Sequence, residues 1–238
     1  MAANKTAIIT GASGGIGGGL VEGFLKAGYN VVATSRQSSQ SMTFSDSLVL
    51  VDGDITKQET ASKTVDAAMK HFGRVDVLVN CAGIFLKKPF IDYTTDDFNA
   101  LVSTNLLGFV YMTQAAVRQM LKQQSGCVVT ISAALADQPV AGDDASVSML
   151  TKGGLNSITK SLAIEYAKAG LRFNTVAPGE VDTPLHKGVS RETLRTYQPM
   201  EKIVEVSDVV GAVLFLAQAG QITGEVLHVD GGEHAGRW

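Results

Sequence analysis

A glycine-rich run near the start of the chain has residue types and spacing that suit phosphate binding. Residues 10–17 read Thr-Gly-Ala-Ser-Gly-Gly-Ile-Gly, between a short apolar run and a predicted helix. Glycine lets the backbone turn sharply and approach an anion, and a helix N-terminus offers unpaired N–H groups and a positive dipole end. Ser13 adds a hydroxyl donor. A turn without a ligand is the alternative, but the strand before it and the helix after it favour a nucleotide phosphate.

Further motifs follow this turn along the chain. They are Asp54, Asn80-Cys81-Ala82-Gly83, Asn105, Lys152, Pro178-Gly179, Thr223-Gly224 and Asp230-Gly231-Gly232. Together with the Thr-Gly-x-x-x-Gly-x-Gly turn, their order and spacing resemble the short-chain dehydrogenase/reductase family over essentially the whole chain. The resemblance implies an NAD(P)(H)-dependent oxidoreductase that transfers a hydride between the nicotinamide and a small carbonyl or alcohol, or a similar C=X group.

The resemblance also implies which residues contact the dinucleotide. Asp54 matches the adenine contact, backbone groups near Val181 and the Thr183 hydroxyl would hold the carboxamide, and Lys152 would hold the ribose. The complete expected set is Gly11, Ser13, Gly15, Ile16, Gly17, Ser35, Arg36, Asp54, Ile55, Asn80, Ala82, Gly83, Lys152, Pro178, Gly179, Val181 and Thr183.

The end of the predicted second strand bears on the choice between NAD and NADP. An NAD site usually has a carboxylate there for the ribose 2′-hydroxyl, but this chain has Ser35 followed by Arg36. An arginine fork pairs well with a phosphate, although a solvated surface arginine is also common. The family's other frequent phosphate-binding base is replaced by Gly14. The missing acid therefore favours NADP(H), with NAD(H) as the alternative.

The family's catalytic set is Asn, Ser, Tyr and Lys, in which Tyr exchanges a proton with the substrate oxygen. Asn105 and Lys152 match this set. Four residues before Lys152, at the position of the family's tyrosine, stands Ser148, and no tyrosine lies between Tyr111 and Tyr166. The chain is thus an atypical member of the family it resembles.

The catalytic serine position also departs from the family pattern. Ala133 stands where the hydroxyl is usual, so Ser132 takes that role only if the following loop shifts the strand end. We hypothesise that Ser148 holds a water polarised by Lys152, because residues four apart lie on one helix face. A simple helix N-cap at Ser148 is the alternative, and the two roles are compatible.

Losing a phenol has a definite chemical cost. A phenol pKa near 10 can be tuned towards neutrality by a nearby ammonium, but a serine hydroxyl cannot. General acid catalysis is worth about 10²- to 10⁴-fold in rate. Asp143 and Asp144 are alternative proton donors, or simply solvated loop acids. Two hypotheses follow: an oxidoreductase with atypical proton transfer, or a weakly active or inactive dinucleotide-binding sensor or regulatory module.

Short β-rich runs alternate with longer helical patterns, which is typical of a Rossmann-type, doubly wound parallel sheet in a single α/β domain. Every motif above falls at the carboxyl end of a predicted strand, where such sheets bind ligands. The predicted strands span 6–10, 30–34, 48–51, 75–79, 127–131, 172–176 and 225–229, and the predicted helices span 16–27, 58–72, 97–122, 148–168 and 206–217.

Composition narrows the functional classes. A net charge of −3 without a basic run disfavours a nucleic-acid partner, and no apolar run at the start is long enough for a membrane span or signal peptide. Two cysteines are too few for a disulfide framework or a zinc site, so we expect no metal and a cytoplasmic protein. We expect residues 185–199, including His186 and Tyr197, to cover a small-molecule substrate as a lid. The family resemblance implies a homodimer or homotetramer packed through helices 97–122 and 148–168.

Overall fold

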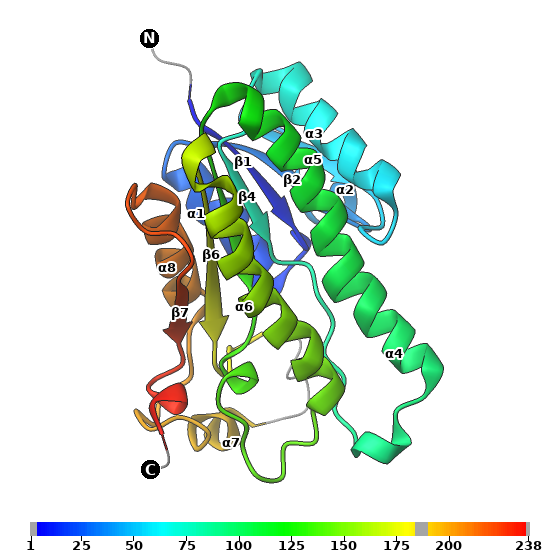
Figure 1. Ribbon diagram of the computed structural model, residues 1–238, viewed down its shortest axis with the longest axis vertical. Helices are drawn as coiled ribbons and strands as arrows, with labels where there is room; N and C mark the ends of the chain where they lie inside the picture. The colour runs from blue at the N-terminus through cyan, green and yellow to red at the C-terminus, as the bar shows by residue number, and fades with distance from the viewer. Residues whose placement is uncertain (1–3, 184–189, 237–238) are drawn as a thin grey trace.

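The computed structural model describes residues 4–183 and 190–236, which form one layered α/β domain (Figure 1). Seven parallel strands make a single sheet in the order β3-β2-β1-β4-β5-β6-β7, which confirms the predicted fold class. The strands are β1 (Thr6–Thr10), β2 (Asn30–Ser35), β3 (Leu48–Asp52), β4 (Val77–Asn80), β5 (Gly126–Ile131), β6 (Leu171–Pro178) and β7 (Val226–Val229).

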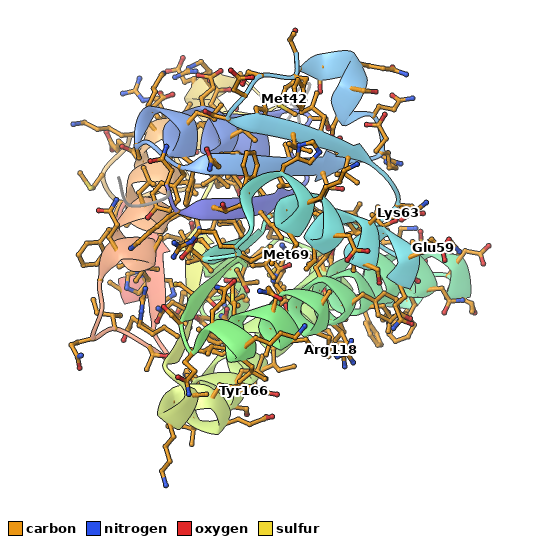
Figure 2. The ribbon with its side chains drawn as sticks, turned by 90° about the horizontal axis from the view of Figure 1, so that it is seen from above. Met42, Glu59, Lys63, Met69, Arg118 and Tyr166 are labelled. Carbon is orange, nitrogen blue, oxygen red and sulfur yellow. The ribbon has the colours of Figure 1, made fainter. Side chains whose placement is uncertain are left out.

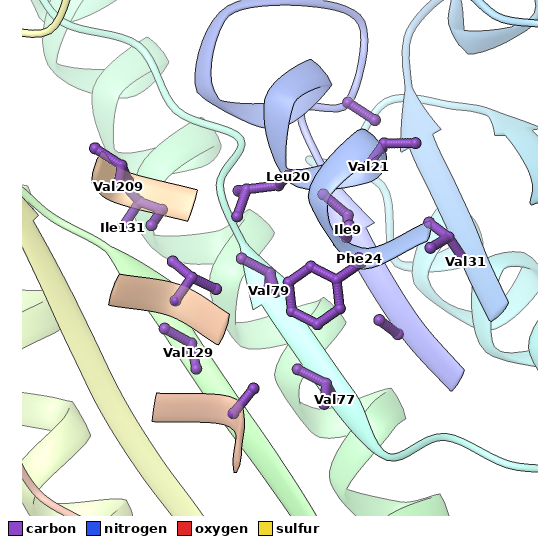
Figure 3. Close-up of a cluster of buried hydrophobic side chains, with 14 of the residues drawn as sticks. Ile9, Leu20, Val21, Phe24, Val31, Val77, Val79, Val129, Ile131 and Val209 are labelled. Carbon is purple, nitrogen blue, oxygen red and sulfur yellow. The ribbon is translucent and has the colours of Figure 1, made fainter. Parts of the chain in front are cut away.

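Helices cover both faces of the sheet, because each face carries branched apolar side chains that water must not reach. One face packs on α1 (Gly15–Lys26) and α8 (Val206–Gln218), and Figure 3 shows Leu20 and Phe24 of α1 directed at Ile9, Val79 and Val129 of the strands. The other face packs on the three longest helices, α3 (Gln58–Phe72), α5 (Gly108–Gln123) and α6 (Ser146–Tyr166).

Along the second face, α3 and α5 lie side by side, with Glu59 and Lys63 of α3 at the outer surface (Figure 2). Shorter helices occur in the connections. They are α2 (Ser38–Ser41), α4 (Thr95–Leu101) and α7 (Arg191–Arg195). The sequence pattern did not predict α2 or α7, since helices of one turn carry too few residues to show periodicity.

The strand order reverses between β1 and β4, and this places a crevice at their carboxyl ends. The two strand ends are tied together by one side chain. Thr10 Oγ1 accepts hydrogen bonds from the N–H groups of Cys81 and Ala82, both at 3.0 Å. The loop after β4 is thereby held against the glycine-rich turn after β1.

The predicted helix over 97–122 is in fact three segments. α4 leads into a π-helical turn at Val102–Leu107, and α5 follows without a break. The whole run Thr95–Gln123 is long and apolar enough to cross a membrane by length and composition, but 44% of its most apolar stretch is buried inside the fold. Because it packs on α3 and the sheet, it is a core helix of this domain.

Candidate active site

The glycine-rich turn has the shape that its sequence predicts. Gly11 has a φ of +67°, and a Cβ there would lie 2.8 Å from the Cα of Ala82. A Cβ at Gly17 would overlap the Gly11 carbonyl oxygen, whereas one at Gly14 would meet nothing within 4 Å. α1 begins here without a side-chain cap. The turn is therefore closed on its protein side and open on the side where the free N–H groups of the α1 N-terminus could bind an anion.

A long groove runs from this turn across the carboxyl ends of β2, β3 and β4. Twelve of the expected dinucleotide contacts line it, which are Gly11, Ser13, Gly15, Ile16, Gly17, Ser35, Arg36, Asp54, Ile55, Ala82, Gly83 and Thr183. The sequence pattern thus brings together residues from five separate segments. The groove also takes in Gln37 and Gln40 beside Arg36.

The end of β2 presents hydroxyl and guanidinium groups to this groove. Ser35 Oγ lies 2.8 Å from Ser38 Oγ and accepts the N–H of Gln37, so the hydroxyl is fixed in place. Asp54 Oδ1 accepts the N–H of Thr56 at 2.9 Å, and this backbone hydrogen bond holds the pKa of Asp54 below its usual value. Asp54 therefore stays ionised and caps its own loop, with Arg36 adding attraction.

Asn80 departs from its predicted role as a dinucleotide contact. Its side chain is buried and donates from Nδ2 to Thr113 Oγ1 on α5 at 3.0 Å. Asn80 is absent from the lining of the groove, because β4 turns this side chain towards α5. It ties the strand end to a helix.

At its inner end the groove opens into a second, mostly apolar chamber. Its apolar wall consists of Ile16, Ile84, Phe85, Ile131, Ala133, Leu135, Pro178 and Val181. Its polar wall consists of Cys81, Ser132, Lys152, Glu180, Thr183 and Glu233. The expected contacts Pro178, Gly179, Val181 and Thr183 all lie here, at the end of β6. Thr183 lines both the groove and the chamber.

Asn105 lies behind the chamber wall, at the π-helical turn. Its Oδ1 accepts the N–H of Ile84 at 2.9 Å, and its Nδ2 donates to the Ile84 carbonyl at 3.0 Å and to Thr151 Oγ1 at 2.9 Å. Extra residues in a helical turn are a frequent device at functional sites. Here the turn directs Asn105 at the loop after β4, so that Asn105 positions Ile84 and joins it to α6.

Lys152 extends from α6 into the chamber wall. Its Nζ donates to the Ile131 carbonyl at 3.0 Å, at the end of β5. Burial lowers the pKa of Lys152 to about 8, with a small opposing effect from Cys81. The same burial raises the pKa of the Cys81 thiol to about 12. Lys152 therefore presents a cation that loses its charge easily.

The structure does not place Ser148 in the chamber, contrary to the relay hypothesis. Its hydroxyl donates to the Leu86 carbonyl at 2.8 Å and accepts the Leu86 N–H at 2.9 Å, and the side chain has 0% exposure. The single O–H donor of Ser148 is already used and the side chain is fully buried, so it does not hold a water shared with Lys152. Nor does Ser148 cap α6, which begins two residues earlier at Ser146.

Ser132 does line the chamber, and its Oγ is buried without a hydrogen-bond partner among the described residues. The loop acids lie elsewhere. Asp143 forms an ion pair with Lys87, and the Asp144 carbonyl accepts the Lys88 N–H at 2.7 Å. Of the expected lid, residues 185–189 and with them His186 fall outside the described part of the chain, while Tyr197 is exposed.

Sequence reasoning missed two acids on the chamber wall, Glu180 and Glu233. Glu180 follows the Pro-Gly motif directly, and Glu233 follows the Asp-Gly-Gly motif. Both motifs end a strand, so a charged residue next to either one was the available signal. Burial and the neighbouring acids raise the pKa of Glu233 to about 7.

The fold and the groove define a nucleotide-binding α/β domain of the doubly wound class, and comparison with known proteins makes this more specific. The family model described as enoyl-(acyl carrier protein) reductase matches residues 11–234. The chain is 33% identical, over 238 residues and 96% of both chains, to the 3-oxoacyl-[acyl-carrier-protein] reductase of Buchnera aphidicola subsp. Baizongia pistaciae. It belongs to the short-chain dehydrogenase/reductase family.

Solved structures agree with this membership. The structure described as ElxO with NADP bound superposes with a TM-score of 0.90 at 32% identity, covering 98% of this chain and 100% of that one. A 3-ketoacyl-(acyl-carrier-protein) reductase from Brucella melitensis, complexed with NADH, has a TM-score of 0.91 at 30% identity, with 98% and 99% covered.

Proposed function

We propose that this protein is an NADP(H)-preferring oxidoreductase that interconverts a small carbonyl compound and its alcohol, with proton transfer that does not use a tyrosine at position 148. The observation that carries this proposal is the continuity of the groove with the chamber. Cys81, Gly83 and Thr183 line both spaces, and Lys152 and Ser132 stand on the chamber wall. A Cβ at Gly83 would lie 3.3 Å from Lys152 Nζ, so this lysine is close to the junction. A dinucleotide along the groove would therefore bring its nicotinamide to these groups.

The residues present fit this cofactor. The open space beside Gly14 and the uncapped start of α1 suit a pyrophosphate, and Asp54 and Ile55 suit an adenosine. The bound nicotinamide would supply or accept a hydride. Lys152 would hold the ribose hydroxyls with its cation, and the unpartnered Ser132 hydroxyl would donate to the substrate carbonyl oxygen.

The preference for NADP rests on the end of β2. Ser35 provides a neutral hydroxyl where a carboxylate would repel a 2′-phosphate, and the exposed guanidinium of Arg36 lies on the same wall. Among the similar structures, ElxO was solved with NADP and the Brucella reductase with NADH, so the family fold accepts both. The preference of this chain for NADP over NAD therefore depends on the side chains of Ser35 and Arg36.

The substrate chamber favours a carbonyl group attached to an apolar body. Ile84, Phe85 and Leu135 contribute apolar surface, which suits an alkyl or acyl chain. Relatives are named for reducing 3-oxoacyl and acetoacetyl thioesters, such as the acetoacetyl-CoA reductase of Acinetobacter sp., 32% identical. A 3-oxoacyl thioester is therefore the first substrate to test.

We also propose that the protein forms a homodimer or homotetramer through α4–α5 and α6. These helices carry large apolar side chains that the single chain leaves exposed, with Phe98 at 43%, Leu150 at 62% and Ile164 at 80%. Exposed apolar groups gathered on neighbouring helices typically mark an interface. Sedimentation of the purified protein would measure its mass in solution.

The decisive experiment measures NADPH oxidation by absorbance with acetoacetyl-CoA, ethyl acetoacetate, menadione and a cyclic imine, alongside binding of NADPH by calorimetry. We expect binding and turnover of at least one carbonyl, with turnover lost in Lys152→Ala. Lys63→Ala, on the exposed face of α3 (Figure 2), is the matched control. Tight binding of NADPH without turnover of any compound would instead support a sensor or regulatory module.

A further inference from the structure

Glu233 is a buried acid that faces the proposed substrate chamber. It lies in a 3-10 turn at Glu233–Ala235, after the Asp-Gly-Gly motif that follows β7, and only 4% of its surface is exposed. Its Oε2 has no hydrogen-bond partner among the described residues. Buried carboxyl groups almost always have partners, so an unpaired one on a cavity wall points to a group that binds there.

The surrounding backbone holds this side chain in place. Asp230 accepts the N–H groups of Gly232 and His234 at 3.0 and 2.8 Å, and the Asp230 carbonyl accepts the Glu233 N–H at 3.2 Å. On the opposite wall, a Cβ at Gly179 would lie 2.8 Å from Glu233 Oε2. Because residue 179 is glycine, the Glu233 carboxyl group has space there. This places the carboxyl group beside the segment 178–183, which is expected to contact the nicotinamide.

Among the described residues of the chamber wall, four side chains carry a titratable proton, Cys81, Lys152, Glu180 and Glu233. The Cys81 thiol, with a pKa of about 12, gives up its proton too reluctantly to act near neutral pH. Lys152 donates from Nζ to the Ile131 carbonyl, and the proposed function assigns its charge to the cofactor ribose. Glu180 acts on its neighbour as a charge and raises the pKa of Glu233.

Burial and nearby charges bring the pKa of Glu233 close to neutral pH. Burial has the largest effect, and the carboxylates of Glu180, Asp230 and Asp143 add to it, so that the pKa rises to about 7. The nearby cation Lys87 is already paired with Asp143, and His234 Nδ1 lies 2.8 Å from Asp230 Oδ2. A carboxylic acid tuned to this range is suited to proton exchange at physiological pH.

We infer that Glu233 is the general acid and base of this enzyme, in place of the tyrosine that the chain lacks. In reduction, the carbonyl carbon gains a hydride from the reduced cofactor while the Glu233 O–H bond breaks and its proton passes to the substrate oxygen. The products are the alcohol, the oxidised cofactor and the Glu233 carboxylate, which regains a proton from water. The inference rests on the proposed function, because it needs a carbonyl substrate in this chamber.

Kinetics of Glu233→Gln and Glu233→Asp test the assignment, with acetoacetyl-CoA or the fastest-reacting carbonyl of the panel above. Glutamine keeps the shape and removes the acid, so we expect kcat to fall by about 10²- to 10⁴-fold while NADPH affinity stays unchanged. The fall in wild-type kcat/KM centred near pH 7 should disappear in Glu233→Gln and return in Glu233→Asp, whereas a fall near pH 8 from loss of the Lys152 charge should remain in all three proteins. Glu225→Gln, an exposed acid beside β7, is the control.

A second measurement needs no turnover. Infrared difference spectra between about pH 5 and about pH 9 should show a carboxylic acid that titrates near neutrality in the wild type with and without NADPH. This signal should vanish in Glu233→Gln and persist in Glu225→Gln. A retained signal in Glu233→Gln would overturn the inference. So would a rise in KM with unchanged kcat and pH profile, since that describes a residue that only binds substrate.

Failure of the proposed function looks different from failure of this assignment. An inactive wild type that binds NADPH overturns both the oxidoreductase proposal and the role of Glu233 within it. An active wild type whose kcat and pH profile survive in Glu233→Gln overturns the assignment alone.

Discussion

Ser148 and Leu86 exchange two hydrogen bonds, one from the Leu86 N–H to Ser148 Oγ at 2.9 Å and one from the Ser148 hydroxyl to the Leu86 carbonyl at 2.8 Å. The pair joins α6 to the loop after β4 across 62 positions in the chain. Tyr93 donates to the same carbonyl at 2.7 Å. Ser148 is thus a structural link between α6 and this loop.

The first prediction follows from this link. Ser148→Ala leaves the Leu86 N–H buried without its partner, so the free energy of unfolding should fall by about 1–3 kcal/mol. The chamber walls are unchanged, so kcat at a temperature where the variant is folded should match the wild type. Denaturant unfolding and steady-state kinetics measure the two effects. A large loss of kcat in a stable Ser148→Ala protein would revive the relay through Lys152.

The second prediction concerns the dinucleotide. Arg36→Ala should weaken NADPH binding by about 10- to 100-fold, since a charge-assisted pair to phosphate contributes about 1.5–3 kcal/mol. NADH binding should barely change. Ser35→Asp should reverse the preference, because a carboxylate repels the 2′-phosphate and accepts hydrogen bonds from a free ribose. Calorimetric titration with both cofactors checks this, and equal losses for both in Arg36→Ala would contradict it.

The third prediction separates two glycines of the same turn. Gly17→Ala should lower stability by about 1–3 kcal/mol or more, because its Cβ overlaps the Gly11 carbonyl. Gly14→Ala should fold as the wild type does, since nothing lies within 4 Å of its Cβ. Any loss of NADPH affinity in Gly14→Ala then reports a ligand in that space. Thermal unfolding with and without NADPH measures both effects, and equal destabilisation by the two substitutions would refute the described turn.

The sequence predicts those parts of the fold that are determined by residues close together in the chain. Strands such as β1 appear as short apolar runs, and the turn at Gly11 needs glycine wherever it occurs, so most boundaries fall within one or two residues of the prediction. The π-helical turn that carries Asn105 is not predictable in this way. Its hydrogen-bond pattern leaves the helical spacing of apolar residues almost unchanged.

The site residues missed or misplaced by sequence all depend on distant partners. The position of Asn80 at a strand end predicts a cofactor contact, but in the fold its side chain donates to Thr113 of α5. In the sequence nothing shows that the Ser148 hydroxyl has a partner, which the fold provides in the backbone of Leu86, in the loop after β4. The carboxyl group of Glu233 has room in the wall only because Gly179, which follows β6, has no side chain. None of these contacts can be predicted from the residues that are neighbours in the sequence.

The last prediction concerns stability and pH at Glu233. Its pKa is about 7 in the folded protein and 4.5 ordinarily. Below pH 4.5 the acid is protonated in both states. Between pH 4.5 and 7 the unfolded chain releases the proton and the folded chain keeps it, so the folded state loses stability as pH rises. Glu233→Gln removes this effect and should exceed wild-type stability by up to about 3 kcal/mol above pH 7.

The difference between Glu233→Gln and wild type should shrink towards zero near pH 4, which urea unfolding at a series of pH values would show. All other titrating groups are shared by the two proteins, so their contributions cancel in the comparison. Glu225→Gln should give no such pH-dependent gain, because that side chain is exposed. A Glu233→Gln protein that is less stable than wild type above pH 7 would mean that the carboxylate is stabilised in the fold, and its assignment as a proton donor would fail with it.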